Sequence, residues 1–255
     1  MKITENEQLT DELLDYLRDV LGGHITLPAI DYKRDLTYYH RSELLGCLMI
    51  PFLARTVGPD DPEPLTKEQA LYFARGRAIE RFFGTDNKPL VKDGIVVSVD
   101  RTSPYHGLVE MKSTVMSSSG FPHAFHDNRK DWAEECKVVA AAYEDTSCNI
   151  AIMFLEGNKK KWGNPDRIPV DLKAWRMEFE TSETWGAWSE LRGRKAVLDD
   201  ALSLGIAPPL DIVKPTASAY YCKECIYGKL CPYWQCLNWG GTVAEQPKVE
   251  ETTND

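Results

Sequence analysis

Three charged residues follow two apolar, β-branched runs in the middle of the chain, and their spacing suits metal chemistry. Residues 96–100 and 108–112 are separated by a break that contains proline and glycine, which is typical of two strands joined by a turn. With the turn centred midway, Asp100 lies opposite Glu110, and alternation along the strand places Lys112 on the same face. Two carboxylates and one ammonium then converge.

Such a face predicts a bound divalent cation. Unpaired buried charge costs on the order of several kcal/mol, and a hard cation such as Mg²⁺ or Mn²⁺ compensates carboxylates. The Met111 carbonyl adds an oxygen ligand, and Lys112 is placed to orient or deprotonate a nearby water. From the spacing alone, the alternative is an edge hairpin that carries Asp100, Glu110 and Lys112 on its exposed surface.

A second group of residues with metal-binding spacing lies near the C-terminus. Cys222, Cys225, Cys231 and Cys236 follow one another closely, and the Cys-x2-Cys pair lets two thiolates from one turn reach the same metal. Zinc would take all four locally, whereas an iron-sulfur cluster would take the first three with a distant fourth ligand. The chain has seven cysteines, and clustered cysteines in a reducing compartment favour metal over disulfides.

Length and composition limit the classes of protein. A chain of 255 residues with 43% hydrophobic content suits one large domain with a substantial core. No apolar run approaches a membrane span, and the first residues lack the regions of a signal peptide, so we expect a cytoplasmic protein without a membrane partner. The net charge of −9 argues against nonspecific coating of nucleic acid, but metal-holding carboxylates leave a nuclease open.

The surrounding elements read as a mixed sheet covered by helices. The continuous apolar run 149–155 predicts a buried strand, and 171–180 a further strand. Apolar residues recur at helical spacing in 67–83, from Asp131 onward, and in 184–204. The order of strand, hairpin, helix and strand predicts a mixed α/β fold.

The order of these motifs resembles the RecB-like branch of the PD-(D/E)XK nucleases. Within that branch the chain is most similar to the iron-sulfur exonucleases associated with CRISPR adaptation and to the nuclease domain of AddB. The resemblance spans roughly residues 40–236 and depends on the order of the motifs rather than on any single one. The motifs are Cys47, Gly76-x3-Glu80, Val99-Asp100-Arg101, Val109-Glu110-Met111-Lys112, Glu135 and Cys222-x2-Cys225-x5-Cys231-Pro232.

The resemblance implies a restriction-endonuclease-like αβββαβ core with helical additions, a 4Fe-4S cluster and cleavage of DNA with Mg²⁺ or Mn²⁺. It assigns metal binding to Asp100 and Glu110 and the catalytic lysine to Lys112. Glu80 falls where many relatives have histidine and would be a further metal ligand. Glu135 falls where many relatives have glutamine and would be an accessory residue.

The same resemblance assigns the cysteines. Cys47 matches the lone N-terminal ligand of the cluster, which Cys222, Cys225 and Cys231 complete. Cys236 is then an extra cysteine outside the pattern, and it keeps the zinc alternative open.

Asp93, followed by Gly94, is a second candidate for the first carboxylate, because many members of the superfamily have Asp-Gly at the start of a strand. In a tight hairpin Asp93 would pair near Ser117, well beyond Glu110, so hairpin geometry favours Asp100. A longer loop or a bulge would reverse that choice.

We therefore expect an N-terminal helical extension at 1–35, a single nuclease domain at 36–240 clamped by the metal cluster, and a disordered acidic tail at 241–255. The expected function is metal-dependent exonucleolytic cleavage of single-stranded DNA or duplex ends, in a complex for CRISPR adaptation or for recombination and repair. The rival function is a noncatalytic zinc-binding adaptor that holds a partner protein through the cysteine knuckle at 222–236.

Overall fold

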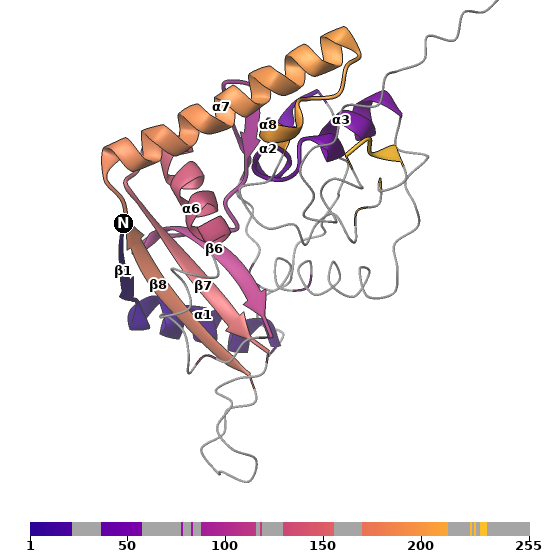
Figure 1. Cartoon of the computed structure of the whole chain (residues 1–255). Helices are drawn as coiled ribbons and strands as arrows, with labels where there is room; N and C mark the ends of the chain where they lie inside the picture. The colour runs from indigo at the N-terminus through magenta and orange to yellow at the C-terminus, as the bar shows by residue number, and fades with distance from the viewer. Residues whose placement is uncertain are drawn as a thin grey trace, which may run out of the picture.

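The computed structural model describes residues 1–21, 37–57, 78, 83, 88–115, 118, 130–155, 170–213, 225, 227 and 230–233. These residues form two mixed sheets with helices packed against them, so the predicted mixed α/β class is confirmed (Figure 1). The tail at 241–255 and most of the predicted helix at 67–83 lie outside the described residues. Among the helices that the structure describes, none is long and apolar enough to cross a membrane.

The larger sheet has five strands in the order β1, β8, β7, β6, β5. Their bounds are Lys2–Glu5 (β1), Arg101–Ser103 (β5), Gly107–Thr114 (β6), Ser147–Phe154 (β7) and Asp171–Glu178 (β8). The β6–β7 pair is parallel, and the other neighbouring pairs are antiparallel. A parallel pair needs a crossover connection, and helix α6 (Lys130–Ala142) lies in the connection between these two strands.

The strands predicted at 149–155 and 171–180 correspond to β7 and β8 and are confirmed. β7 is buried along its length except at half-buried Met153, as expected for an apolar strand with neighbours on both sides. The expected N-terminal helical extension also contributes a strand: β1 pairs with β8 before helix α1 (Glu7–Leu21) begins. The first residues are therefore part of the sheet.

Helices cover both faces of this sheet. On one face, Met111 of β6 and Ala151 of β7 belong to a cluster with Leu9 and Leu13 of α1. On the other face, Ile150 of β7 belongs to the larger core that α6 and α7 (Thr181–Leu204) complete. Figure 1 shows α7 running across α6, with α1 away from both. Because side chains alternate along a strand, Glu110 and Lys112 lie on the face that α6 covers.

A smaller sheet has the order β2 (Tyr39–His40), β4 (Ile95–Val97), β3 (Leu90–Lys92). A tight turn joins β3 to β4 with positive φ at both Asp93 (52°) and Gly94 (73°). The prediction of one strand over 96–100 is wrong, because β4 ends at Val97 and β5 begins at Arg101 in the other sheet. The chain changes sheets between these two residues.

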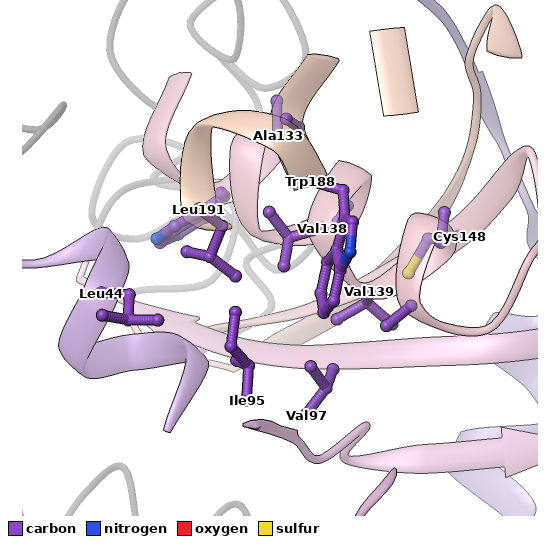
Figure 2. Packing of buried hydrophobic residues seen from close by; sticks show 14 of the residues in the cluster. Leu44, Ile95, Val97, Ala133, Val138, Val139, Cys148, Trp188 and Leu191 are labelled. Carbon is purple, nitrogen blue, oxygen red and sulfur yellow. The ribbon is translucent and has the colours of Figure 1, made fainter. Parts of the chain in front are cut away.

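The smaller sheet packs on α7 together with α2 (Arg41–Leu45). Figure 2 shows Ile95 and Val97 of β4 and Leu44 of α2 in the same buried cluster as Trp188 and Leu191 of α7. The short helices α3 (Met49–Thr56) and α8 (Leu210–Val213) lie at this end of the fold (Figure 1).

Buried Arg194 joins α7 to the end of α2 and to α8. Its guanidinium donates to the carbonyls of Leu44 at 2.5 Å, Gly46 at 2.6 Å and Ile212 at 2.8 Å. Arg194 therefore fixes the segment that leads from α2 into Cys47 against α8.

The turn of the β5–β6 hairpin lies where the sequence predicts it, between Ser103 and Gly107. Buried Asn149 of β7 supports this turn, because its Nδ2 donates to the carbonyls of His106 at 2.7 Å and Leu108 at 3.2 Å. A neighbouring strand thus fixes the register of the hairpin.

Candidate active site

Glu110 lies at the bottom of a group of charged side chains between β6, α2 and α6. Its side chain is 0% exposed, and Arg41 at the start of α2 binds both of its oxygens. Arg41 Nη1 is 2.9 Å from Oε1, and Nη2 is 3.0 Å from Oε2. Two parallel N–H···O bonds of this kind are a strong form of ion pair.

Lys112 lies two residues further along β6 on the same face. Its Nζ is 3.8 Å from Glu110 Oε2 and 2.5 Å from Oε2 of Glu135, which α6 supplies. Glu135 is also 3.9 Å from Arg41 Nη2. Carboxylates and cations thus alternate through the group, and Glu135 takes part in it through Lys112.

Asp100 joins the group from the residue before β5. Arg101 pairs with Val109, so the same register continued by one residue places Asp100 opposite Glu110. Asp100 Oδ2 accepts a hydrogen bond of 2.8 Å from the backbone nitrogen of Met111. The structure therefore brings Asp100, Glu110 and Lys112 together, as the hairpin spacing predicts.

The alternative of an exposed surface triplet is wrong for this chain, although the β5–β6 hairpin does lie at the edge of the sheet, with β5 as the edge strand. β6 has β5 on one side and β7 on the other. Glu110 is fully buried, and the neighbouring Met111 is buried on the opposite face with the α1 cluster. A buried carboxylate needs a compensating cation, and Arg41 supplies it here.

Burial, opposed by Arg41 and aided by the negative charge of Asp100, raises the pKa of Glu110 to about 7. Burial would lower the pKa of Lys112, but Glu135, Glu110 and Asp100 together raise it well above its ordinary value. The pKa of Glu135 is lowered, because Lys112 and Arg41 outweigh its burial. Lys112 is therefore a firmly held cation near neutral pH, which suits orienting a water rather than deprotonating it.

Exposure increases across the group in one direction. The side chains are 0% exposed at Glu110, 12% at Arg41, 19% at Lys112 and 27% at Glu135. Glu110 is therefore the innermost of these side chains, and Glu135 is the one most open to solvent.

Sequence reasoning did not identify Arg41 as a member of the group. The residues around Arg41 carry no motif that points to a site. Ser42 lies inside α2, His40 is the residue before the helix, and Glu43 Oε2 accepts the His40 backbone N–H at 2.8 Å. Only the folded structure identifies Arg41, because its carboxylate partner, Glu110, is 69 residues away in the sequence.

Asp93, the alternative first carboxylate, lies in the β3–β4 turn and contacts α7. Its Oδ2 accepts a hydrogen bond of 3.0 Å from Trp188 Nε1 and is 3.4 Å from Arg192 Nε. These contacts connect the turn to α7. Of the two aspartates, Asp100 is the one that joins Glu110. Glu80, the other predicted metal ligand, lies outside the described residues.

The five cysteines that the structure describes belong to the larger core or pack against it. Cys47 is buried in the main core, and Cys225 and Cys231 pack, partly buried, against that same core. Cys222 and Cys236 lie outside the described residues.

Cys136 and Cys148 are fully buried core residues. A hydrogen bond to Cys136, together with burial, raises the pKa of the Cys148 thiol well above its usual range. The Cys148 thiol is therefore protonated and unsuited to binding a metal.

The donor chemistry of the charged group fits a hard divalent cation, since Asp100, Glu110 and Glu135 offer carboxylate oxygens. The arrangement of these side chains, however, is not that of a preformed metal site. Within the part of the chain that the structure describes, no three His, Cys, Asp or Glu side chains converge to hold a metal ion. The oxygens of Glu110 point at Arg41 instead.

Comparisons with known proteins give no family for this chain. No family model matches it, and no curated protein matches it. Among solved structures, one described as "Crystal structure of SSO0001" aligns over 88% of this chain and 96% of that chain, with 14% identity and a TM-score of 0.36. A likeness of that strength carries no argument about fold or function.

Proposed function

We propose that this chain is a metal-dependent deoxyribonuclease, a phosphodiester hydrolase that degrades single-stranded DNA or duplex ends exonucleolytically. One observation carries the proposal: Asp100, Glu110 and a charged lysine share one face of a buried hairpin, although they come from separate runs of sequence. Buried acidic and basic groups gathered in this way are candidates for catalysis.

The proposed fold family is the RecB-like PD-(D/E)XK branch with its restriction-endonuclease-like αβββαβ core. Three features support it: the β5–β6 hairpin, the α6 connection to a parallel β7, and the antiparallel β8. The proposed location is the cytoplasm, within a DNA-processing complex of the CRISPR-adaptation or recombination and repair type.

The residues take distinct roles in the proposed reaction. Asp100, Glu110 and the Met111 carbonyl would hold Mg²⁺ or Mn²⁺, with Glu80 as a further ligand. A bound ion of this kind supplies a Lewis acid for the scissile phosphate. Lys112 donates to the attacking water and stabilises the negative charge that develops on the phosphate. Glu135 keeps the Lys112 ammonium in place and is itself an accessory residue.

A cleavage assay on the purified chain tests the proposal. Single-stranded DNA labelled at one end should be shortened stepwise with Mn²⁺ or Mg²⁺ and remain intact with EDTA. Glu110→Gln keeps the shape of the side chain but removes the charge that a cation needs, so this variant should lose cleavage. Cleavage by Glu110→Gln at the parent rate, or cleavage that continues in EDTA, would contradict the proposal.

We propose further that Cys47, Cys222, Cys225 and Cys231 hold a structural 4Fe-4S cluster. The supporting observation is that Cys47, in the segment after α2, belongs to the same core against which the C-terminal Cys225 and Cys231 pack. A cluster there would connect the segment after α2 to the C-terminal segment, and its binding free energy would add to the stability of the fold.

Cysteine variants purified without oxygen test the cluster. Cys47→Ala should lose iron and sulfide and lower the melting temperature, because it removes a ligand from the N-terminal side of the clamp. Cys236→Ala is the matched control. It should keep its iron, its sulfide and its melting temperature, and it should show the broad absorption of an iron-sulfur protein in the visible blue. Full metal content in Cys47→Ala, together with zinc that is lost in Cys236→Ala, would instead support the local zinc knuckle.

A further inference from the structure

Arg41 occupies the two oxygens of Glu110 that a metal ion would use. Both contacts are short, 2.9 Å and 3.0 Å, and Glu110 has no exposed surface through which a second cation could bind it from another side. A divalent cation and Arg41 therefore compete for the same two atoms.

The charges of the group indicate that a divalent cation would replace Arg41 on Glu110 rather than bind beside it. Three carboxylates, of Asp100, Glu110 and Glu135, face two cations, Arg41 and Lys112. A divalent ion that enters with Arg41 still in place turns this net negative group into a net positive one. An anion at the opening would then restore the balance.

The guanidinium needs a new partner when it leaves Glu110. Glu135 is 3.9 Å from Arg41 Nη2, but its Oε2 already accepts from Lys112 at 2.5 Å. Arg41 is only 12% exposed, and an unpaired buried cation is strongly disfavoured. A phosphate offers the same pair of oxygens as a carboxylate, and the fork of an arginine binds both groups in the same bidentate way.

We propose that Arg41 is a phosphate-binding residue of the site, released by the divalent cation from Glu110 to a phosphate of the DNA. This inference rests on the proposed nuclease function. It makes metal binding and DNA binding mutually dependent: the metal frees Arg41 for the DNA, and by linkage the DNA strengthens metal binding by the same factor. Without metal, the Arg41 guanidinium stays on the two oxygens of Glu110 and is not available to a phosphate.

The exchange predicts opposite effects of Arg41→Ala on the two ligands. Without DNA, this variant should bind Mn²⁺ about tenfold more tightly than the parent, because no guanidinium competes for Glu110. With Ca²⁺ in place of Mn²⁺ to prevent cleavage, it should bind a short fluorescein-labelled DNA strand about tenfold more weakly. Calorimetry or the electron paramagnetic resonance of Mn²⁺ gives the first affinity, and fluorescence anisotropy gives the second.

Arg55→Ala is a matched control, because Arg55 makes a similar buried pair with Glu43. Its Nη1 is 3.1 Å from Oε1 and its Nη2 is 3.3 Å from Oε2. The side chain of Arg55 is 10% exposed and that of Glu43 is 3% exposed, close to the values for Arg41 and Glu110. Arg55→Ala should lower the melting temperature but change neither affinity.

If Arg41→Ala does not fold, Arg41→Lys serves in its place. The lysine keeps the charge but loses the bidentate fork, so its Mn²⁺ affinity should lie above that of the parent and its DNA affinity below it. Unchanged Mn²⁺ affinity in the folded variant would overturn the inference and leave the nuclease proposal intact. A parent protein that binds no Mn²⁺ and cleaves no DNA would overturn both.

Discussion

Asp100→Asn should lower the single-turnover rate of DNA cleavage by on the order of a thousandfold or more while the chain remains folded. Asparagine keeps a side-chain oxygen that can accept the 2.8 Å hydrogen bond from the Met111 nitrogen, so the hairpin register survives. It removes the negative charge beside Glu110, and with it one of the two hairpin carboxylates proposed to hold the metal. Rapid-quench kinetics under saturating Mn²⁺ measures the rate, and circular dichroism checks the fold.

Asp93→Asn is the natural control for this experiment. The amide oxygen can still accept from Trp188 Nε1, and the lost ion pair with Arg192 is largely exposed, so the free energy of unfolding should change by less than about 1 kcal/mol. Cleavage should proceed at the parent rate. The opposite pair of results, with Asp93→Asn inactive and Asp100→Asn active, would identify Asp93 as the carboxylate that holds the metal.

Lys112→Ala should keep Mn²⁺ binding and DNA binding but lower the single-turnover rate by on the order of a hundredfold or more. Glu135 raises the pKa of Lys112 and is 2.5 Å from its ammonium, so this cation is fixed where the proposed reaction needs it, beside the attacking water. A lysine that only balanced charge would behave differently, because its removal would strengthen metal binding and leave turnover unchanged. Calorimetry and single-turnover kinetics on one preparation separate the two roles.

Lys137→Ala controls for the loss of a half-buried ion pair near the site. Lys137 lies on α6 two residues after Glu135, is 17% exposed compared with 19% for Lys112, and is 2.7 Å from Glu134. We expect a small loss of stability and no loss of rate. If Lys112→Ala cleaves DNA as fast as the parent under saturating Mn²⁺, the catalytic role of Lys112 is refuted.

The regular elements were predictable because their patterns are long and local. The helices from Asp131 and in 184–204 carry apolar residues at helical spacing over several turns, and they correspond to α6 and α7. Gly205, at φ 65°, ends α7 where a left-handed residue is needed and where the sequence predicts the end of the helix. The strand at 149–155 is apolar without interruption from Ile150 onward, which is typical of a strand with neighbours on both sides.

Other features depend on partners far away in the chain. Residues 96–100 look like one strand, because local β-propensity carries no information on which sheet a residue joins. β1 is only four residues long, and its pairing with β8 joins Lys2 to Glu178. Arg41 has no motif of its own, and only the tertiary fold brings it to Glu110 of β6. A single sequence does not specify such contacts.

The charged group has a consequence for how the chain matures. Its members come from four segments: Arg41 from α2, Asp100 from before β5, Glu110 and Lys112 from β6, and Glu135 from α6. Closing such distant segments is costly in chain entropy and occurs only as the fold consolidates. A chain emerging from the ribosome lacks the complete group until Glu135 has been synthesised and α6 has docked. In the proposed nuclease, truncated or partly folded copies would therefore lack the complete site for cleaving DNA.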